Sequence, residues 1–208
     1  MKKLALSLLL LSGFVFKAQD ASKVFSATEI VWFGMDFTKA TFVGQFDQGM
    51  GAMPATGGDM KNKWIPQWNS LIATEQQNFD FKKALGKDNI YYDITAMNTL
   101  NTKINPDGCM DVNPRKIERS AIDGMVKKYS SNDKKEGVGL AFIVENFNKG
   151  AQVADIYVTF FDIATKKVLI CEKITGAAKG IGMRNYWAGA VKSIIKDLGS
   201  GTFKSWKK

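Results

Sequence analysis

The chain has 208 residues, 45% of them hydrophobic and 24% charged, with 29 basic against 20 acidic side chains and no histidine. The missing histidine excludes Ser-His-Asp and Cys-His nucleophilic machinery, histidine-bearing zinc sites and the commonest general base near neutral pH. The length suits one domain with a substantial core.

The chain opens with a pattern typical of a secretory signal peptide. Two lysines precede an apolar run that begins at Leu4 and reaches Phe16. A membrane-spanning helix needs about 20 apolar residues, so this run is too short to remain as one. We predict a signal peptide at 1–18, with a cut after Ala21 as the alternative, and a single soluble domain at 19–208. It is expected in the periplasm or outside the cell, and it is not lipidated, because no cysteine lies near the cut.

The first predicted element of the mature chain is a central strand that begins at Glu29. Aromatic and β-branched residues are dense there. Period-two alternation places one set of side chains on one face, Val31, Phe33, Met35 and Phe37, and the set Trp32, Gly34 and Asp36 on the other.

A flexible loop is predicted at 44–63. This stretch holds five glycines, one proline and three methionines, Met50, Met53 and Met60, a composition that fits neither helix nor strand. Loops of this length are uncommon in compact domains and are either functional or disordered. Two roles of this loop remain as alternatives: a plain connector, or a surface that makes adaptable apolar contacts with a partner.

Helices and strands then alternate. A helix is predicted from about Ile65 to Asn78, a helical turn ends at Gly86, and "DNIYYDIT" after it is typical of a strand. "NPDG" at 105–108 has the composition of a type I turn.

The next predicted helix has the clearest start signal. Asn113 suits the N-cap and Pro114 the first helical position, and apolar residues recur every four positions from Ile117 to Tyr129.

Three strand candidates follow, "VGLAFIVENF", "ADIYVTFFDI" and "KKVLICEKIT", and the last two are predicted to be antiparallel neighbours. The last helix is expected from Arg184 to Leu198. This order predicts an α/β fold (mixed α+β), a single sandwich with a mixed sheet of about five strands flanked by about three helices. A C-terminal antiparallel hairpin leads into the last helix. Eight side chains are predicted to be mostly buried: Trp32, Phe33, Trp68, Ile122, Phe142, Val158, Phe160 and Trp187.

Carboxylates offer the remaining route to catalysis, but their spacing selects no acid/base pair. We predict no catalytic residue, no metal site and no cofactor. Asp36 is the unusual carboxylate, because it ends a strand with apolar neighbours and needs hydrogen bonds there. Capping the strand end is the preferred role and ligand binding the alternative. Cys109 and Cys171 can pair in an oxidising compartment or remain as buried thiols.

The turn at 176–185 is rich in glycine and leads into the last helix, with Lys179 and Arg184 as cations. It lacks the third glycine of the dinucleotide-binding pattern, and no Gly-Lys-Ser/Thr is present. We expect packing, with Asn185 as the helix cap, and anion binding as the alternative. The basic tail at 202–208 is either a frayed end or a weak contact with an anionic surface. No motif indicates nucleic-acid binding.

Three segments, "VWFGMDFTKATFVG", "VTFFDIATKKVL" and "GMRNYWAG", resemble those of uncharacterised exported bacterial proteins of about this length. The element order also resembles the small α/β envelope domains of the curli-secretion lipoprotein and of the amino end of the TolB translocation protein. The resemblance implies a binding or scaffold role rather than catalysis.

Two functional hypotheses follow. The first is an exported, non-enzymatic envelope protein that binds an envelope partner, with Met50, Met53 and Met60 as contacts. The second is a small-ligand (anion) binder or carboxylate enzyme with its site between loop 44–63 and turn 176–185, using Asp36, Lys179 or Arg184.

Overall fold

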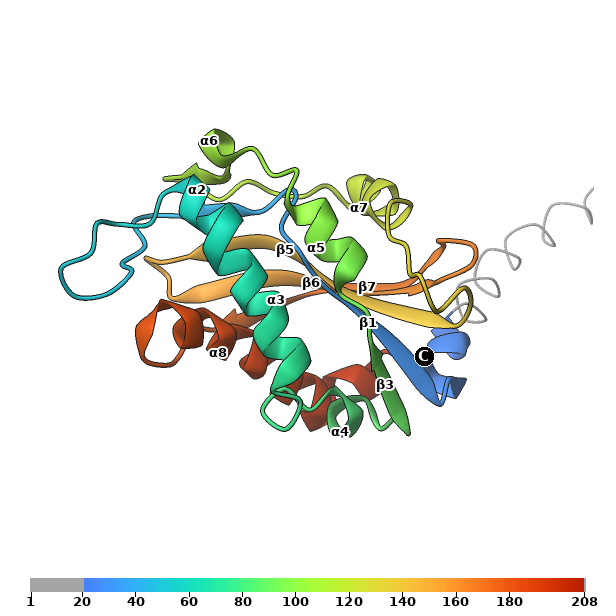
Figure 1. Cartoon of the computed structure of the whole chain (residues 1–208). Coiled ribbons are helices and arrows are strands. Elements are labelled where there is room, and N and C mark those ends of the chain that lie inside the picture. The colour runs from blue at the N-terminus through green and yellow to red at the C-terminus, as the bar shows by residue number, and fades with distance from the viewer. Residues whose placement is uncertain (1–20, 208) are drawn as a thin grey trace, which may run out of the picture.

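A computed structural model describes residues 21–207, which form a mixed α/β fold with one seven-stranded sheet between two layers of helices (Figure 1). The predicted α/β class is confirmed. The strands are β1 (Glu29–Asp36), β2 (Thr41–Val43), β3 (Asn89–Tyr92), β4 (Met110–Asp111), β5 (Val138–Asn148), β6 (Val153–Asp162) and β7 (Val168–Ala177). The predicted signal peptide at 1–18 lies outside the described residues and stays a prediction.

The helical segments outnumber the three predicted. Residues 21–26 are helical, and the helical segments after them are α2 (Gly57–Asp59), η1 (Met60–Trp64), α3 (Ile65–Thr74), α4 (Phe81–Leu85), α5 (Thr95–Asn101), α6 (Pro106–Cys109), α7 (Arg119–Val126), α8 (Gly182–Asp197), η2 (Leu198–Thr202) and α9 (Phe203–Ser205). Within residues 21–207, no helix is both long enough and apolar enough to cross a membrane.

The sheet is built around β5. On one side it pairs in parallel with β1 and then, further along, with the short β2, while β3 and β4 extend these two in parallel. On the other side β5 pairs antiparallel with β6, and β6 with β7. The predicted number of about five strands was too low because β2 and β4 are too short to show a pattern. The predicted antiparallel pair is β6 and β7, followed by α8.

A β-bulge in β1 makes the predicted alternation wrong. Trp32 pairs with Leu140 and Gly34 with Ala141, so Phe33 is an extra residue in the ladder. Gly34 has φ of +100°, and a Cβ there would lie 2.9 Å from the Asn69 Oδ1 atom. The two faces therefore exchange along β1: Val31 and Phe33 lie in one apolar cluster, Ile30, Trp32, Met35 and Phe37 in the other.

Beyond the bulge, β1 runs past the last paired residue of β3, and two buried asparagines take over as hydrogen-bond partners. The Asn69 amide, from α3, accepts from Met35 N at 2.7 Å and donates to Met35 O at 3.1 Å. The Asn101 amide, from α5, donates to the same carbonyl at 2.8 Å and accepts from Phe37 N at 2.8 Å. Two side chains thus complete the hydrogen bonding of this edge of the strand.

Each face of the sheet has its own apolar core. The larger core lies under α3, α4, α8 and α9, and the smaller one lies under α5 and α7. All eight side chains predicted to be buried are at most 2% exposed, which confirms that part of the strand and helix assignment.

Two predicted boundaries differ from those in the structure, and the tail has contacts that the sequence did not predict. The loop that begins at Gly44 ends at Thr56 rather than 63, because Thr56 and Asp59 form a capping box that starts α2. The predicted cap at Asn113 is wrong: residues 112–118 are not helical, and α7 begins at Arg119. The basic tail is anchored, since the Phe203 ring packs 5.0 Å from Phe25 and 5.5 Å from Phe160.

The asparagine pairing predicts a stability effect. Replacing Asn69→Leu leaves the buried Met35 N–H without an acceptor, so the free energy of unfolding should fall by about 1–3 kcal/mol. Urea unfolding followed by tryptophan fluorescence measures this. Gln67→Leu, an exposed site on the same helix, is the control and should change stability by less than about 0.5 kcal/mol. Equal stability of the two variants would show that the pairing contributes nothing.

Candidate functional site

One end of the molecule carries exposed apolar side chains. Within residues 21–207, the large apolar side chains that are mostly exposed are Met50, Met53, Val112 and Ile181, each at least 81% accessible. Met50 and Met53 lie on the loop 44–56, which projects beyond the sheet (Figure 1). Val112 follows β4, and Ile181 precedes α8. We call these four residues and the loop the apolar tip.

Two hollows lie between the loop and the neighbouring segments of the apolar tip. One is lined by Gln45 and Ala55 of the loop together with Val112. The other, which we call the loop pocket, has a volume of about 230 Å³. It is lined by Phe46, Asp47, Gly49, Lys149, Gly182, Met183, Tyr186 and Trp187. The loop thus lies between the segment after β4 and the start of α8.

The loop pocket has aromatic walls and a charged rim. The Phe46 and Trp187 rings are 5.1 Å apart between centroids. The Lys149 Nζ atom lies 3.6 Å from the Asp47 carboxylate and 5.2 Å from the centre of the Tyr186 ring. Such a pocket suits an apolar or aromatic group, with the ion pair at its edge.

The predicted methionine contacts separate in the structure. Met50 and Met53 are exposed at 106% and 81%, whereas Met60 is fully buried in the larger core. Met60 begins η1, so it belongs to the helical segment and not to the loop.

Asp36 lies at the end of β1 and is 1% exposed. Its Oδ1 atom accepts from the Thr38 backbone N–H at 2.7 Å and from the Thr38 hydroxyl at 2.6 Å. Its Oδ2 atom accepts from the Tyr129 hydroxyl at 2.7 Å. Burial raises the pKa of Tyr129 well above its usual value. The carboxylate therefore caps the strand end and is satisfied internally.

The two cations of the turn at 176–185, Lys179 and Arg184, differ in their surroundings. The Arg184 guanidinium lies 3.7 Å from the Glu75 carboxylate of the α3 C-cap, and its Nε donates to Asn185 Oδ1. Lys179 is exposed. Asn185 does not cap the helix, because α8 already begins at Gly182.

Close packing accounts for two glycines near this turn. A Cβ on Gly189 would lie 1.9 Å from the Lys179 carbonyl oxygen, and one on Gly176 would lie 2.2 Å from the Ala190 carbonyl oxygen. Glycine is therefore required for the turn and β7 to approach α8.

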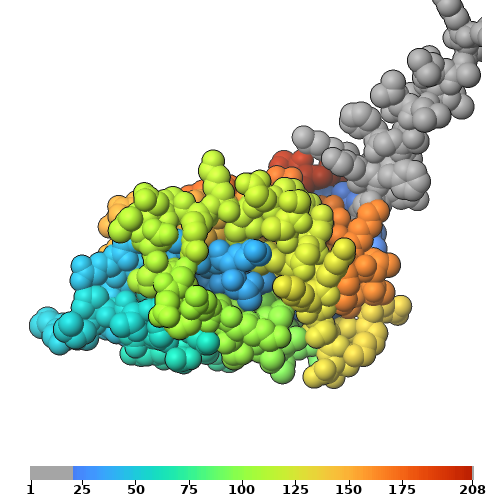
Figure 2. Space-filling view, turned by 90° about the horizontal axis from the view of Figure 1, so that it is seen from above, coloured from blue at the N-terminus to red at the C-terminus, as the bar shows by residue number. Residues whose placement is uncertain are grey.

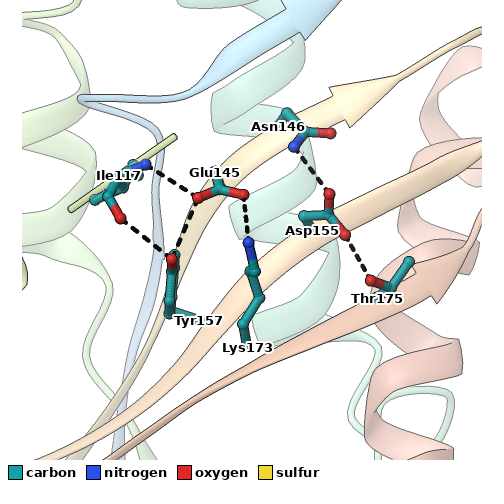
Figure 3. Close-up of polar contacts among 7 residues, drawn as sticks. All are labelled: Ile117, Glu145, Asn146, Asp155, Tyr157, Lys173 and Thr175. Atoms are coloured by element: carbon teal, nitrogen blue, oxygen red, sulfur yellow. Dashed lines mark hydrogen bonds and ion pairs between the residues drawn. The ribbon is translucent and has the colours of Figure 1, made fainter. Parts of the chain in front are cut away.

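A buried polar cluster was not selected by the sequence patterns (Figure 3). Glu145 is 3% exposed and sits in a bulge of β5. Its Oε2 accepts from Lys173 Nζ at 2.9 Å, and its Oε1 lies 3.2 Å from the Tyr157 hydroxyl and accepts from Ile117 N at 3.0 Å. Glu145 is the one carboxylate of β5 and follows an apolar run from Leu140 to Val144, which was the signal in the sequence.

This cluster fastens residues 112–118, which we call the strap, to the sheet. Ile117 N donates to Glu145, and Ile117 O lies 3.1 Å from the Tyr157 hydroxyl (Figure 3). Two residues earlier, Arg115 Nε donates to the Thr41 hydroxyl at 3.0 Å, and its Nη2 donates to Gly108 O. The strap is therefore held at two points without being a strand.

The cysteines do not pair: Cys109 is a buried free thiol and Cys171 a partly exposed one. Burial raises the pKa of both thiols, which favours the unreactive protonated form. In the part of the chain that the structure describes, no group of three or more metal-ligating side chains is found.

Comparisons with models of protein families, with curated proteins and with solved structures give no match to this chain. Functional inference therefore depends on the geometry above and on the sequence patterns.

The Glu145 cluster predicts a pH-dependent stability. The hydrogen bond to Glu145 raises the pKa of Lys173 above 10.5, so its stabilising contribution is present at neutral pH and is lost as pH rises through the raised pKa. Glu145→Gln should be less stable than wild type by about 1–3 kcal/mol at pH 8. The difference in stability between the variant and wild type should shrink above pH 10.5. Urea unfolding at pH 8 and at a pH above 10.5 measures it.

Glu172→Gln is the matched control, because Glu172 is the exposed neighbour on β7. It should follow the wild-type pH dependence. A Glu145→Gln deficit that stays constant from pH 8 to alkaline pH would argue against the ion pair as its source.

Proposed function

We propose that the protein is an exported, non-enzymatic module of the bacterial cell envelope that binds another envelope protein through the apolar tip. The observation that carries this proposal is that Met50, Met53, Val112 and Ile181 are each at least 81% exposed and stand on segments that line two shared hollows. Large apolar side chains gathered at one place on a protein surface mark interaction sites. The partner is a protein that presents apolar side chains of its own.

The composition of the loop fits this role. Methionine is unbranched and polarisable, so it adapts to apolar surfaces of varied shape. The loop also has glycines with positive φ at positions 49 and 51, where side chains of other residues would be strained. Such a loop adjusts its course when a partner binds.

The loop pocket supplies an anchoring point beside Met50 and Ile181. Its aromatic walls and volume of about 230 Å³ suit one apolar or aromatic side chain of a partner. The Lys149 and Asp47 ion pair at the rim supplies polar contacts around it.

The proposal that the protein is exported depends on the predicted signal peptide at 1–18 and on the resemblance to exported envelope domains. The absence of histidine supports a binding role, because it removes the commonest general base. The internally satisfied Asp36 supports it as well.

The second candidate is a small-ligand binder with its site between the loop and the turn at 176–185. The loop pocket favours it, since residues from both segments line it. Its polar groups are Lys149 and Asp47, in place of the predicted Asp36, Lys179 and Arg184.

Site-specific photocrosslinking in intact cells tests the interaction. A photoreactive amino acid at position 50 or 53 should give one shared adduct with one envelope protein. The same amino acid at positions 67 and 76, which are exposed on α3 and just after it, should not. The triple variant Met50→Ser, Met53→Ser and Ile181→Ser should bind that purified partner at least about tenfold more weakly, because apolar burial is lost.

Gln67→Ser with Gln76→Ser is the control variant and should bind as wild type does. Failure to obtain a shared adduct from positions 50 and 53, with the protein folded and abundant, would contradict the proposal. An adduct with a second copy of this chain would contradict the stated partner.

A further inference from the structure

A further cavity, distinct from the two hollows at the apolar tip, is lined in part by the strap. It has a volume of about 460 Å³ and is bounded by three segments: the β1–β2 turn at 38–40, the region 104–109 around α6, and strap residues 115–118. Figure 2 looks onto this face and shows the blue turn framed by green and yellow-green segments. We call this cavity the strap cavity. Its volume is in the range of small-molecule sites, about 300–1,000 Å³.

The lining of the strap cavity is positively charged. Lys39, Arg115 and Lys116 line it, against the single carboxylate of Glu118. Within residues 21–207, neither Lys39 nor Lys116 forms an ion pair with a carboxylate. Unpaired cations that converge on a concave surface attract anions.

Arg115 is oriented in advance for an anion. Its Nε donates to the Thr41 hydroxyl at 3.0 Å, and one Nη2 hydrogen bonds to Gly108 O. A guanidinium has five N–H donors, so three remain for a ligand. Because its plane is already fixed, a bidentate contact with a carboxylate or phosphate loses less side-chain entropy.

The strap cavity also holds a neutral donor and an apolar wall. Asn105 lines it, and its Oδ1 atom accepts from Asp107 N at 3.2 Å. Its Nδ2 group has no acceptor within the described chain and is a donor for a ligand. Ile104 and Ala121 provide apolar surface for a carbon skeleton.

We propose that the strap cavity binds a small organic anion through its carboxylate or phosphate group. Arg115 gives the bidentate contact, Lys39 and Lys116 neutralise the charge, and Asn105 donates a further hydrogen bond. Glu145 is a positioning residue, because it holds Ile117 and with it the strap that carries Arg115. The site is separate from the apolar tip, so the proposal does not depend on the partner.

Amide chemical shifts of the purified protein test the proposal. Titration with inorganic phosphate and, separately, with succinate at constant ionic strength should give saturating shifts at Lys39, Asn105, Gly108 and Arg115 for at least one anion. Lys39→Gln with Lys116→Gln should weaken this binding about tenfold, since two charge-assisted contacts are lost. Arg115 keeps its structural hydrogen bonds in this variant.

Lys82→Gln with Lys128→Gln is the matched control, because it removes the same charge from exposed sites elsewhere. It should bind as wild type does. Saturation by succinate identifies a carboxylate ligand, and saturation by phosphate identifies a phosphorylated one. If neither anion saturates at millimolar concentration, or if the control weakens binding equally, the proposal is overturned.

Discussion

Strand β1 extends beyond the end of its neighbour β3, and two buried asparagines supply the hydrogen bonds that β3 no longer provides. The pairing with β3 stops at Trp32, while β1 continues to Asp36 inside the protein. Each buried backbone group left without a partner costs about 1–3 kcal/mol. Asn69 from one helical layer and Asn101 from the other satisfy the backbone groups of Met35 and Phe37. The two layers thereby close over an edge of β1 that would otherwise be open.

A related arrangement holds the strap. Within residues 21–207 no strand pairs with the backbone of Ile117, yet Glu145 accepts from its N–H and the Tyr157 hydroxyl lies at hydrogen-bond distance from its carbonyl. The carboxylate is buried because Lys173 and a backbone donor compensate its charge. Side chains thus replace strand pairing at two places in one sheet. The first place fixes where β1 turns toward β2 and the loop, and the second fixes where Arg115 lies.

The sequence patterns predicted the layers better than the connections. Density of aromatic and β-branched residues located the long strands, and eight core side chains were predicted correctly. The alternation along β1 was wrong because Gly34 permits a bulge, for which an isolated glycine in a strand is the available signal. The capping box of Thr56 and Asp59 was also readable, and it would have excluded Met60 from the loop.

Other features depend on residues far apart in the chain. Asn113 and Pro114 are good helix-start signals, yet contacts of Arg115 and Ile117 with β2 and β5 hold this stretch in a non-helical course. Local propensity is weak beside such tertiary contacts. Glu145 and Lys173 are 28 positions apart, so their pairing is visible only in the fold. The apolar tip likewise joins loop, β4 and α8 segments that no local pattern connects.

The most direct test is native-state hydrogen exchange of the purified protein, followed residue by residue. The amides of Met35, Phe37 and Ile117 are bonded to side chains and not to a neighbouring strand. We predict that they exchange as slowly as Leu140 and Phe142 in the centre of β5, because all open in the same cooperative unfolding. Exchange of these three amides at the rate of loop 44–56 would contradict the claim that side chains complete the sheet.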